Sequence, residues 1–130
     1  MDGKGTLVVR VTTSRAQIPV EGASVVVTQK TPEGKYILLS VQATDSSGEI
    51  KPISIPTPAL SDSAQPGATQ LPYTVCDVWA EHPDYAMLLV EGVQIFDGVV
   101  TLQTMRLSPL YSGQSSLIQN EVRDIPSQNL

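Results

Sequence analysis

The residues best suited to binding chemistry lie between positions 73 and 81. Polar and aromatic side chains alternate there with small apolar ones, as in a strand that buries one face. The second face carries Tyr73, Val75, Asp77, Trp79 and Glu81. Two carboxylates buried without partners would cost several kcal/mol each, so we expect this face to point outward, to solvent.

An indole with a carboxylate two residues away on either side could bind a carbohydrate. Trp79 would stack on a sugar ring while Asp77 and Glu81 accept hydrogen bonds from its hydroxyls. The candidate ligand-binding residues are Tyr73, Asp77, Trp79 and Glu81. A structural alternative stays open, in which Trp79 is covered by the loop from Pro56 to Pro72, by the C-terminal tail or by a neighbouring subunit.

The same residues do not make a catalytic pair. Asp77 and Glu81 stand about 13 Å apart along a strand, too far for either glycosidase geometry. His82 is the one histidine and is followed by Pro83, a pairing typical of a turn. No plausible nucleophile and base come together, so we expect no catalytic residues and no enzyme activity.

Metal and redox chemistry also find little support. Cys76 is the only cysteine, which excludes an intramolecular disulfide and a thiolate cluster. Its place on the apolar face of residues 73–81 predicts a small buried side chain. Residues 45–49 provide too few ligands for a calcium loop and indicate a turn instead. We therefore expect no metal and no cofactor.

Length and charge indicate one globular domain that binds neither nucleic acid nor the membrane interior. The 130 residues carry 13 acidic and 8 basic side chains, a formal net charge of −5, with no basic cluster. No apolar stretch is long enough to span a membrane, and the first residues do not resemble a signal peptide. The compartment stays undetermined.

Seven segments have the pattern of short strands, separated by turn residues and without a convincing amphipathic helix. They are residues 6–13, 23–29, 36–43, 50–55, 73–81, 87–96 and 99–107. This pattern predicts an all-β fold, a seven-stranded antiparallel β-sandwich. The predicted core includes Val25, Val27, Ile37, Leu39 and Val78, with Val41 and Ala43 also placed inward.

Individual proline, glycine and aspartate residues predict bulges and turns. Pro52 places the fourth strand at a sheet edge or a bulge, and Gly92 predicts a bulge in the sixth. Asp45 and Gly48 predict a turn with a positive φ at the glycine, and Asp97-Gly98 predicts a hairpin.

The chain divides into a sandwich domain, residues 1–111, and a linker with a C-terminal tail, residues 112–130. Leu117, Ile118, Val122 and Ile125 make the tail more apolar than a free linker needs. We therefore expect it to contact the domain's own sheet, a sister subunit or a separate partner. The role of the loop from Pro56 to Pro72 stays undetermined.

Several of these motifs, taken in order, resemble those of a known family. They are Pro19-Val20-Glu21-Gly22-Ala23 with Val25 and Val27, Thr44-Asp45 with Gly48, and His82-Pro83-Asp84-Tyr85. Their order and spacing resemble the carboxypeptidase regulatory-like domain family over residues 5–110. The resemblance implies a transthyretin-like (prealbumin-like) sandwich. Asp84 departs from the family pattern, which commonly has glycine there.

The resemblance also bears on function. Residues 93–98, with Leu107 and Pro109-Leu110, are similar to a subgroup found in spore-forming Gram-positive bacteria, where such domains accompany peptidoglycan-binding modules. A purine-pathway hydrolase of the same fold needs several histidines, which this chain lacks. Adhesin relatives often carry an isopeptide bond, but residues 99–107 contain neither Asn nor Asp to receive a lysine.

The expected function is a non-catalytic accessory, spacer or adhesive module associated with the cell envelope or the spore. The alternative is a carbohydrate- or peptidoglycan-binding module that uses the face around Trp79. Its partners would then be a cell-wall glycan or another envelope protein.

Overall fold

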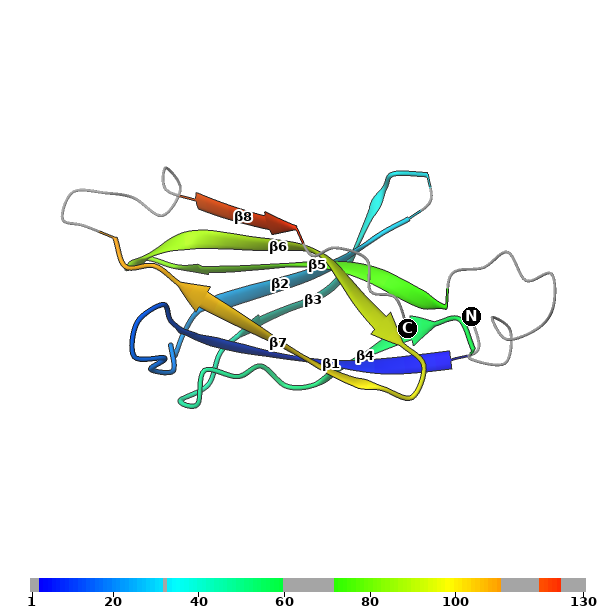
Figure 1. Ribbon diagram of the computed structural model, residues 1–130, viewed down its shortest axis with the longest axis horizontal. Coiled ribbons are helices and arrows are strands. Elements are labelled where there is room, and N and C mark those ends of the chain that lie inside the picture. Colours follow the sequence, from blue (N-terminus) through cyan, green and yellow to red (C-terminus); the bar gives the residue numbers. More distant parts are fainter. Residues whose placement is uncertain (1–2, 32, 60–71, 111–119, 125–130) are drawn as a thin grey trace.

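The computed structural model describes residues 3–31, 33–59, 72–110 and 120–124 (Figure 1). These ranges form eight strands and no helix, and so the fold is all-β, as predicted. The strands are β1 (Gly3–Thr13), β2 (Ser24–Lys30), β3 (Tyr36–Ala43), β4 (Ile53–Thr57), β5 (Tyr73–His82), β6 (Tyr85–Phe96), β7 (Val100–Leu107) and β8 (Asn120–Asp124). No helix of these ranges is long and apolar enough to cross a membrane.

The strands form two sheets that pack as a sandwich. The three-stranded sheet has the order β4-β1-β7, and the five-stranded sheet has the order β3-β2-β5-β6-β8. Most pairs are antiparallel, but β1 pairs with β7, and β6 with β8, in parallel. These two parallel pairs were not predicted. Each joins strands that no hairpin connects, so no tight turn forces them to be antiparallel.

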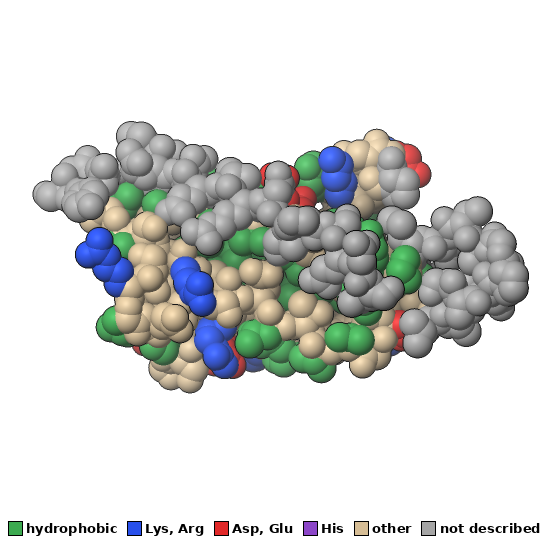
Figure 2. All heavy atoms as spheres, viewed as in Figure 1, with side chains coloured by type: hydrophobic (Ala, Val, Ile, Leu, Met, Phe, Trp, Pro, Cys, Tyr) green, Lys and Arg blue, Asp and Glu red, His purple; other side chains and the backbone are tan. Residues whose placement is uncertain are grey.

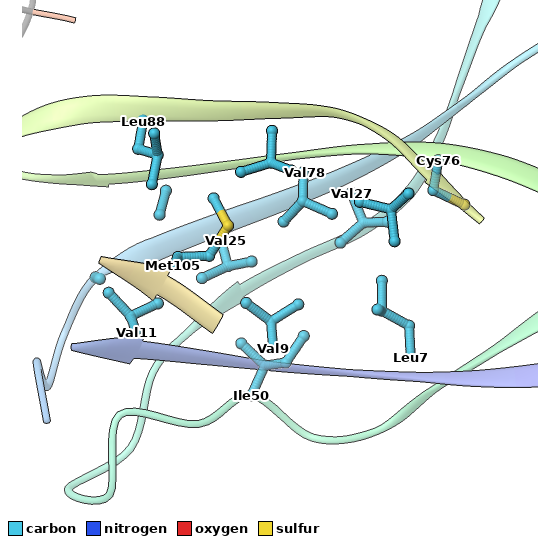
Figure 3. Close-up of a cluster of buried hydrophobic side chains, with 14 of the residues drawn as sticks. Leu7, Val9, Val11, Val25, Val27, Ile50, Cys76, Val78, Leu88 and Met105 are labelled. Carbon is cyan, nitrogen blue, oxygen red and sulfur yellow. The ribbon is translucent and has the colours of Figure 1, made fainter. Parts of the chain in front are cut away.

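The core lies between the two sheets, where alternate residues of each strand meet (Figure 3). Leu7, Val9 and Val11 point inward from β1 and are fully buried. Val25, Val27 and Val78 are also fully buried, which confirms their predicted place in the core. In Figure 3 these side chains point toward one another from β1 on one side and from β2 and β5 on the other.

Three of the four β3 residues that were predicted to point inward are exposed. Ile37 is 48% exposed and Val41 60%, while Ala43 is also exposed. Leu39 is partly buried and packs against the core. For Val41 and Ala43 the cause is a register shift in the pairing of β2 with β3, where Val27 faces Ser40 but the next residue faces Leu38. Ile37 lies before the shift, opposite Gln29, and is on the inner face of the edge strand.

That shift makes Leu39 an extra residue, a β-bulge, and reverses the faces beyond it. Val41 then lies opposite Val26 on the outer face, and Gln42 takes the inner position. The Gln42 side-chain amide donates to the Lys51 carbonyl at 3.1 Å, and its oxygen accepts from the Lys51 N–H at 2.9 Å. An inward polar side chain is tolerated because β3 is an edge strand and the backbone of residue 51 satisfies it.

Several local predictions are confirmed. Asp45 Oδ1 accepts from the N–H groups of Ser47 and Glu49, and Gly48 has φ +75°. The strand β4, at an edge of its sheet, begins just after Pro52. Gly98 also has positive φ, but the hairpin predicted at Asp97-Gly98 was wrong, because β6 and β7 lie in different sheets and this turn carries the chain from one sheet to the other.

One residue that holds two turns together was not found from the sequence. Thr44 is 5% exposed, and its hydroxyl donates to the Val20 carbonyl at 2.6 Å. The same oxygen accepts from the Ala23 N–H at 3.0 Å. Thr44 therefore ties the end of β3 to the turn that leads into β2.

Part of the predicted tail joins the domain's own sheet. Residues 120–124 form β8, which pairs in register with Met87–Glu91 of β6. The predicted tail contacts of Leu117, Ile118 and Ile125 fall outside the described residues, as does most of the loop from Pro56 to Pro72.

Candidate ligand-binding face

The candidate site lies on the outer face of the five-stranded sheet. Directly opposed residues of antiparallel strands project from the same face. Val26 of β2 lies opposite both Val41 of β3 and Trp79 of β5, and Trp79 lies opposite Leu89 of β6. These four residues form one apolar row across four strands, which we call the Trp79 row.

The Trp79 row is open to solvent in part. Val41 is 60% exposed, and Val26, Trp79 and Leu89 are half-buried. The indole is therefore neither a core residue nor a freely solvated one. Its neighbours on both sides are aliphatic, so the indole is the one aromatic member of an otherwise aliphatic row.

Asp77 lies on the same face, but its carboxylate binds the backbone of the neighbouring strand β6. Its exposure is only 9%, and Oδ1 accepts from the Gly92 N–H at 3.2 Å. Cys76 pairs with Val93 while Val78 pairs with Val90, so β6 bulges at this point and Gly92 has φ +81°. The bulge predicted at Gly92 is therefore present.

The expectation that the Asp77 carboxylate would be exposed to solvent was wrong. The energetic cost of burying the Asp77 carboxylate is offset by the bulge, because the bulge leaves a backbone N–H from which the carboxylate accepts a hydrogen bond. With its first oxygen engaged and little surface left, Asp77 is poorly placed to bind sugar hydroxyls.

Thr28 lies directly opposite Asp77 on β2 and is 5% exposed. Within the described part of the chain its hydroxyl has no hydrogen-bond partner. Together the two side chains place a buried polar spot beside the Trp79 row. Neither Thr28 nor Asp77 is exposed enough to form hydrogen bonds with a ligand at the surface.

The other two predicted residues flank the row at unequal distances. Glu81 lies two residues beyond Trp79 on the same face, opposite Ser24, and is half-buried. Tyr73 lies at the far end of β5, about 20 Å from Trp79 along the strand. Its ring packs edge-on against Phe96, with centroids 5.5 Å apart. One small ligand cannot contact both aromatic rings.

Cys76 points into the core from the opposite face of β5 and is fully buried. Burial, and secondarily the Asp77 carboxylate, raise the pKa of its thiol to about 12. The thiol is therefore protonated and a poor nucleophile at neutral pH. This agrees with the small buried side chain predicted from the sequence.

His82 takes the turn role that the sequence indicated. Its Nδ1 accepts from the Asp84 N–H at 3.1 Å, and its ring packs edge-on against Tyr85 with centroids 5.3 Å apart. No three His, Cys, Asp or Glu side chains in the described ranges gather where they could hold a metal ion.

Sequence reasoning found Trp79 but missed the rest of its row. Val26, Val41 and Leu89 come from three other strands, and only the register of the sheet brings them together. One signal was available, because Val26 interrupts a strand whose outward positions are otherwise polar: Ser24, Thr28 and Lys30.

Comparison with known proteins gives a likeness of fold. No protein-family model matches the sequence, and no curated protein matches it significantly. The resemblance to the carboxypeptidase regulatory-like family therefore stays a prediction.

Among solved structures, transthyretin from Sparus aurata is 18% identical, with a TM-score of 0.43 over 78% of this chain and 89% of that one. A variant of catechol 1,2 dioxygenase from Acinetobacter radioresistens is 14% identical, with a TM-score of 0.51. That alignment covers 93% of this chain but only 58% of the dioxygenase. At these identities the likeness concerns the fold alone.

Proposed function

We propose that this chain is a non-catalytic accessory module of the adhesive kind, which binds another protein through the outer face of its five-stranded sheet. The observation that carries the proposal is the Trp79 row, a partly exposed apolar line across four strands with an indole within it. Protein interfaces typically have apolar, aromatic centres and polar rims.

The surroundings of Trp79 favour a protein partner over a sugar. A sugar site combines an aromatic platform with polar groups that converge on the hydroxyls. Here the neighbours of Trp79 across the sheet are Val26 and Leu89, and Asp77, one of its two flanking carboxylates, is buried against the bulge. The polar residues that remain, Ser24 and Glu81, lie to one side, as a rim would.

A carbohydrate- or peptidoglycan-binding module is the second candidate. It is favoured by the half-buried indole with Glu81 two residues away on the same face. The setting at the cell envelope or the spore, for either candidate, is supported by the motif resemblance. Another envelope protein is the partner that fits the first candidate, and a cell-wall glycan is the partner that fits the second.

Binding assays with two surface variants test the proposal. The immobilised chain is exposed separately to purified peptidoglycan and to a solubilised envelope protein fraction. The Trp79→Ala variant should no longer bind a protein from the fraction. The Val100→Ala variant should still bind it, because Val100 is 68% exposed on the other sheet. Melting temperatures confirm that both variants are folded. Equal retention by both variants would contradict the proposal, and retention of peptidoglycan that needs Trp79 would favour the second candidate.

A further inference from the structure

The strand β3 is an edge strand of the five-stranded sheet. One side of it pairs with β2, and no strand in residues 3–31, 33–59, 72–110 or 120–124 pairs with the other side. Tyr36–Ala43 contains no charged side chain and no proline, the residues that usually keep an edge from pairing. Within the described residues, the outer side of β3 has no paired strand.

The side chains of β3 favour pairing as well. Tyr36 and Leu38 are both 61% exposed, Val41 is 60% and Ile37 48% exposed. The tip of the β2–β3 hairpin, cyan in Figure 1, stands away from the rest of the molecule, and apolar side chains are visible on it in Figure 2. This is a concentration of exposed apolar side chains on one edge.

We propose that β3 pairs antiparallel with β3 of a second copy of this chain, which joins two five-stranded sheets into one. A two-fold axis midway between Leu39 and Ser40 gives a self-complementary register. On the outer face, Leu38 then lies opposite Val41 of the second copy. On the inner face, Ile37 lies opposite Gln42 of the second copy.

The bulge at Leu39 is what makes this register consistent. In a regular strand, residues an odd number apart project from opposite faces, so Leu38 and Val41 could not meet. Here Leu38 lies opposite Thr28 and Val41 opposite Val26, both outer-face positions of β2. The extra residue therefore puts Leu38 and Val41 on one face, where a two-fold axis brings each to the other.

Charge at the ends of the strand supports a second copy as the occupant. Lys35 precedes β3 and Asp45 follows Thr44 at its end, while the strand between them is uncharged. Antiparallel pairing of two copies places Lys35 of each beside Thr44 and Asp45 of the other, so opposite charges meet twice. Asp45 holds its own turn through Oδ1.

The inference does not depend on the proposed function, because the edge of β3 and the Trp79 row can be occupied at the same time. Dimerisation would extend the row, since Val41 at its end would be followed by Leu38 of the second copy. A dimer would then present two apolar rows that meet at the two-fold axis.

Sedimentation velocity of the full chain over a wide range of concentration tests the dimer, and charged variants test its register. Leu38→Lys and Val41→Glu should each weaken dimerisation by about ten-fold or more, because each change occurs twice per dimer. Mixing the two variants should restore a heterodimer, because the new lysine and glutamate then face each other. Both native side chains are largely exposed, so the melting temperatures should stay close to that of the wild type.

The control is Val100→Lys, which puts the same charge on β7, an edge strand of the other sheet. It should leave dimerisation unchanged. The proposal is overturned if the wild-type chain is monomeric throughout, or if Val100→Lys weakens the dimer as much as Leu38→Lys. It is also overturned if the mixture of the two β3 variants stays monomeric.

Discussion

Thr44 is a buried side chain whose hydroxyl makes two hydrogen bonds, one to the Val20 carbonyl and one from the Ala23 N–H. Thr44→Val keeps the shape of the side chain but leaves both backbone groups unpaired. We expect the free energy of unfolding to fall by about 1–3 kcal/mol, measured by urea denaturation.

Thr12 provides the matched control. It is also 5% exposed, but its hydroxyl has no hydrogen-bond partner in the described part of the chain. Thr12→Val should therefore be nearly neutral or stabilising. Equal losses in the two variants would contradict the role assigned to Thr44.

Gly48 and Gly22 separate a steric requirement from a conformational one. Both have positive φ, +75° and +79°, but a Cβ on Gly48 would lie 2.4 Å from the Val11 carbonyl oxygen, whereas one on Gly22 would meet nothing within 4 Å. Gly22→Ala should cost about 1 kcal/mol, and Gly48→Ala clearly more. Chemical denaturation of both variants checks the order, and a smaller loss at Gly48 would show that the turn can shift.

The buried thiol of Cys76 should respond to pH in a defined direction. Its pKa is raised by burial from 9.0 to about 12 in the folded chain, so above pH 9 the unfolded chain loses a proton that the folded chain keeps. The stabilisation is complete below pH 9 and is lost as the pH rises toward 12. The free energy of unfolding of the wild type should therefore fall more steeply in this window than that of Cys76→Ala. Parallel pH profiles would contradict the burial of the thiol.

At the scale of elements, the sequence predicts strands well and their partners poorly. The strand predicted over residues 6–13 is present as β1, and its alternating residues Leu7, Val9 and Val11 are fully buried, because a central strand is patterned by the core it covers. The edge strand β3 lacks that constraint. Its four apolar alternating residues suggested a buried face, but one inserted residue, Leu39, exchanged the faces of Val41 and Gln42.

The strand β8 was missed because Asn120–Asp124 has little apolar alternation of its own. It joins the sheet through backbone pairing with Met87–Glu91, and that depends on an edge that the rest of the chain creates. Deleting residues 112–130 should therefore lower the melting temperature, since it uncovers the edge of β6. Deleting only residues 125–130 should have a smaller effect. An unchanged melting temperature after the longer deletion would show that β8 adds no stability.

At the scale of the whole molecule, the register of the strands in the five-stranded sheet decides which side chains share its outer face. The sequence placed Tyr73, Asp77, Trp79 and Glu81 on one face of one strand. Pairing with β6 shows that Asp77 is held by a bulge, while the six-residue separation along β5 already puts Tyr73 far from Trp79. The bulge cannot be predicted from a single strand, because it depends on how β6 pairs with β5.

The same strand pairing places Val26, Val41 and Leu89 in line with Trp79, which forms the Trp79 row. A carboxylate withdrawn from the surface and aliphatic neighbours on both sides change the kind of ligand that the face fits. These features support the proposed protein interface over the carbohydrate site that was the alternative from the sequence.

The most direct test of this central claim uses the fact that Trp79 is the only tryptophan in the chain. Biosynthetic incorporation of 5-fluorotryptophan gives one fluorine resonance, which reports on the outer face even in a crude mixture. In a solubilised envelope protein fraction we expect this resonance to shift or broaden, and in peptidoglycan fragments we expect it to stay unchanged. A resonance that stays unchanged while the chain is retained by a protein partner would contradict the claim, as would one that responds to peptidoglycan fragments alone.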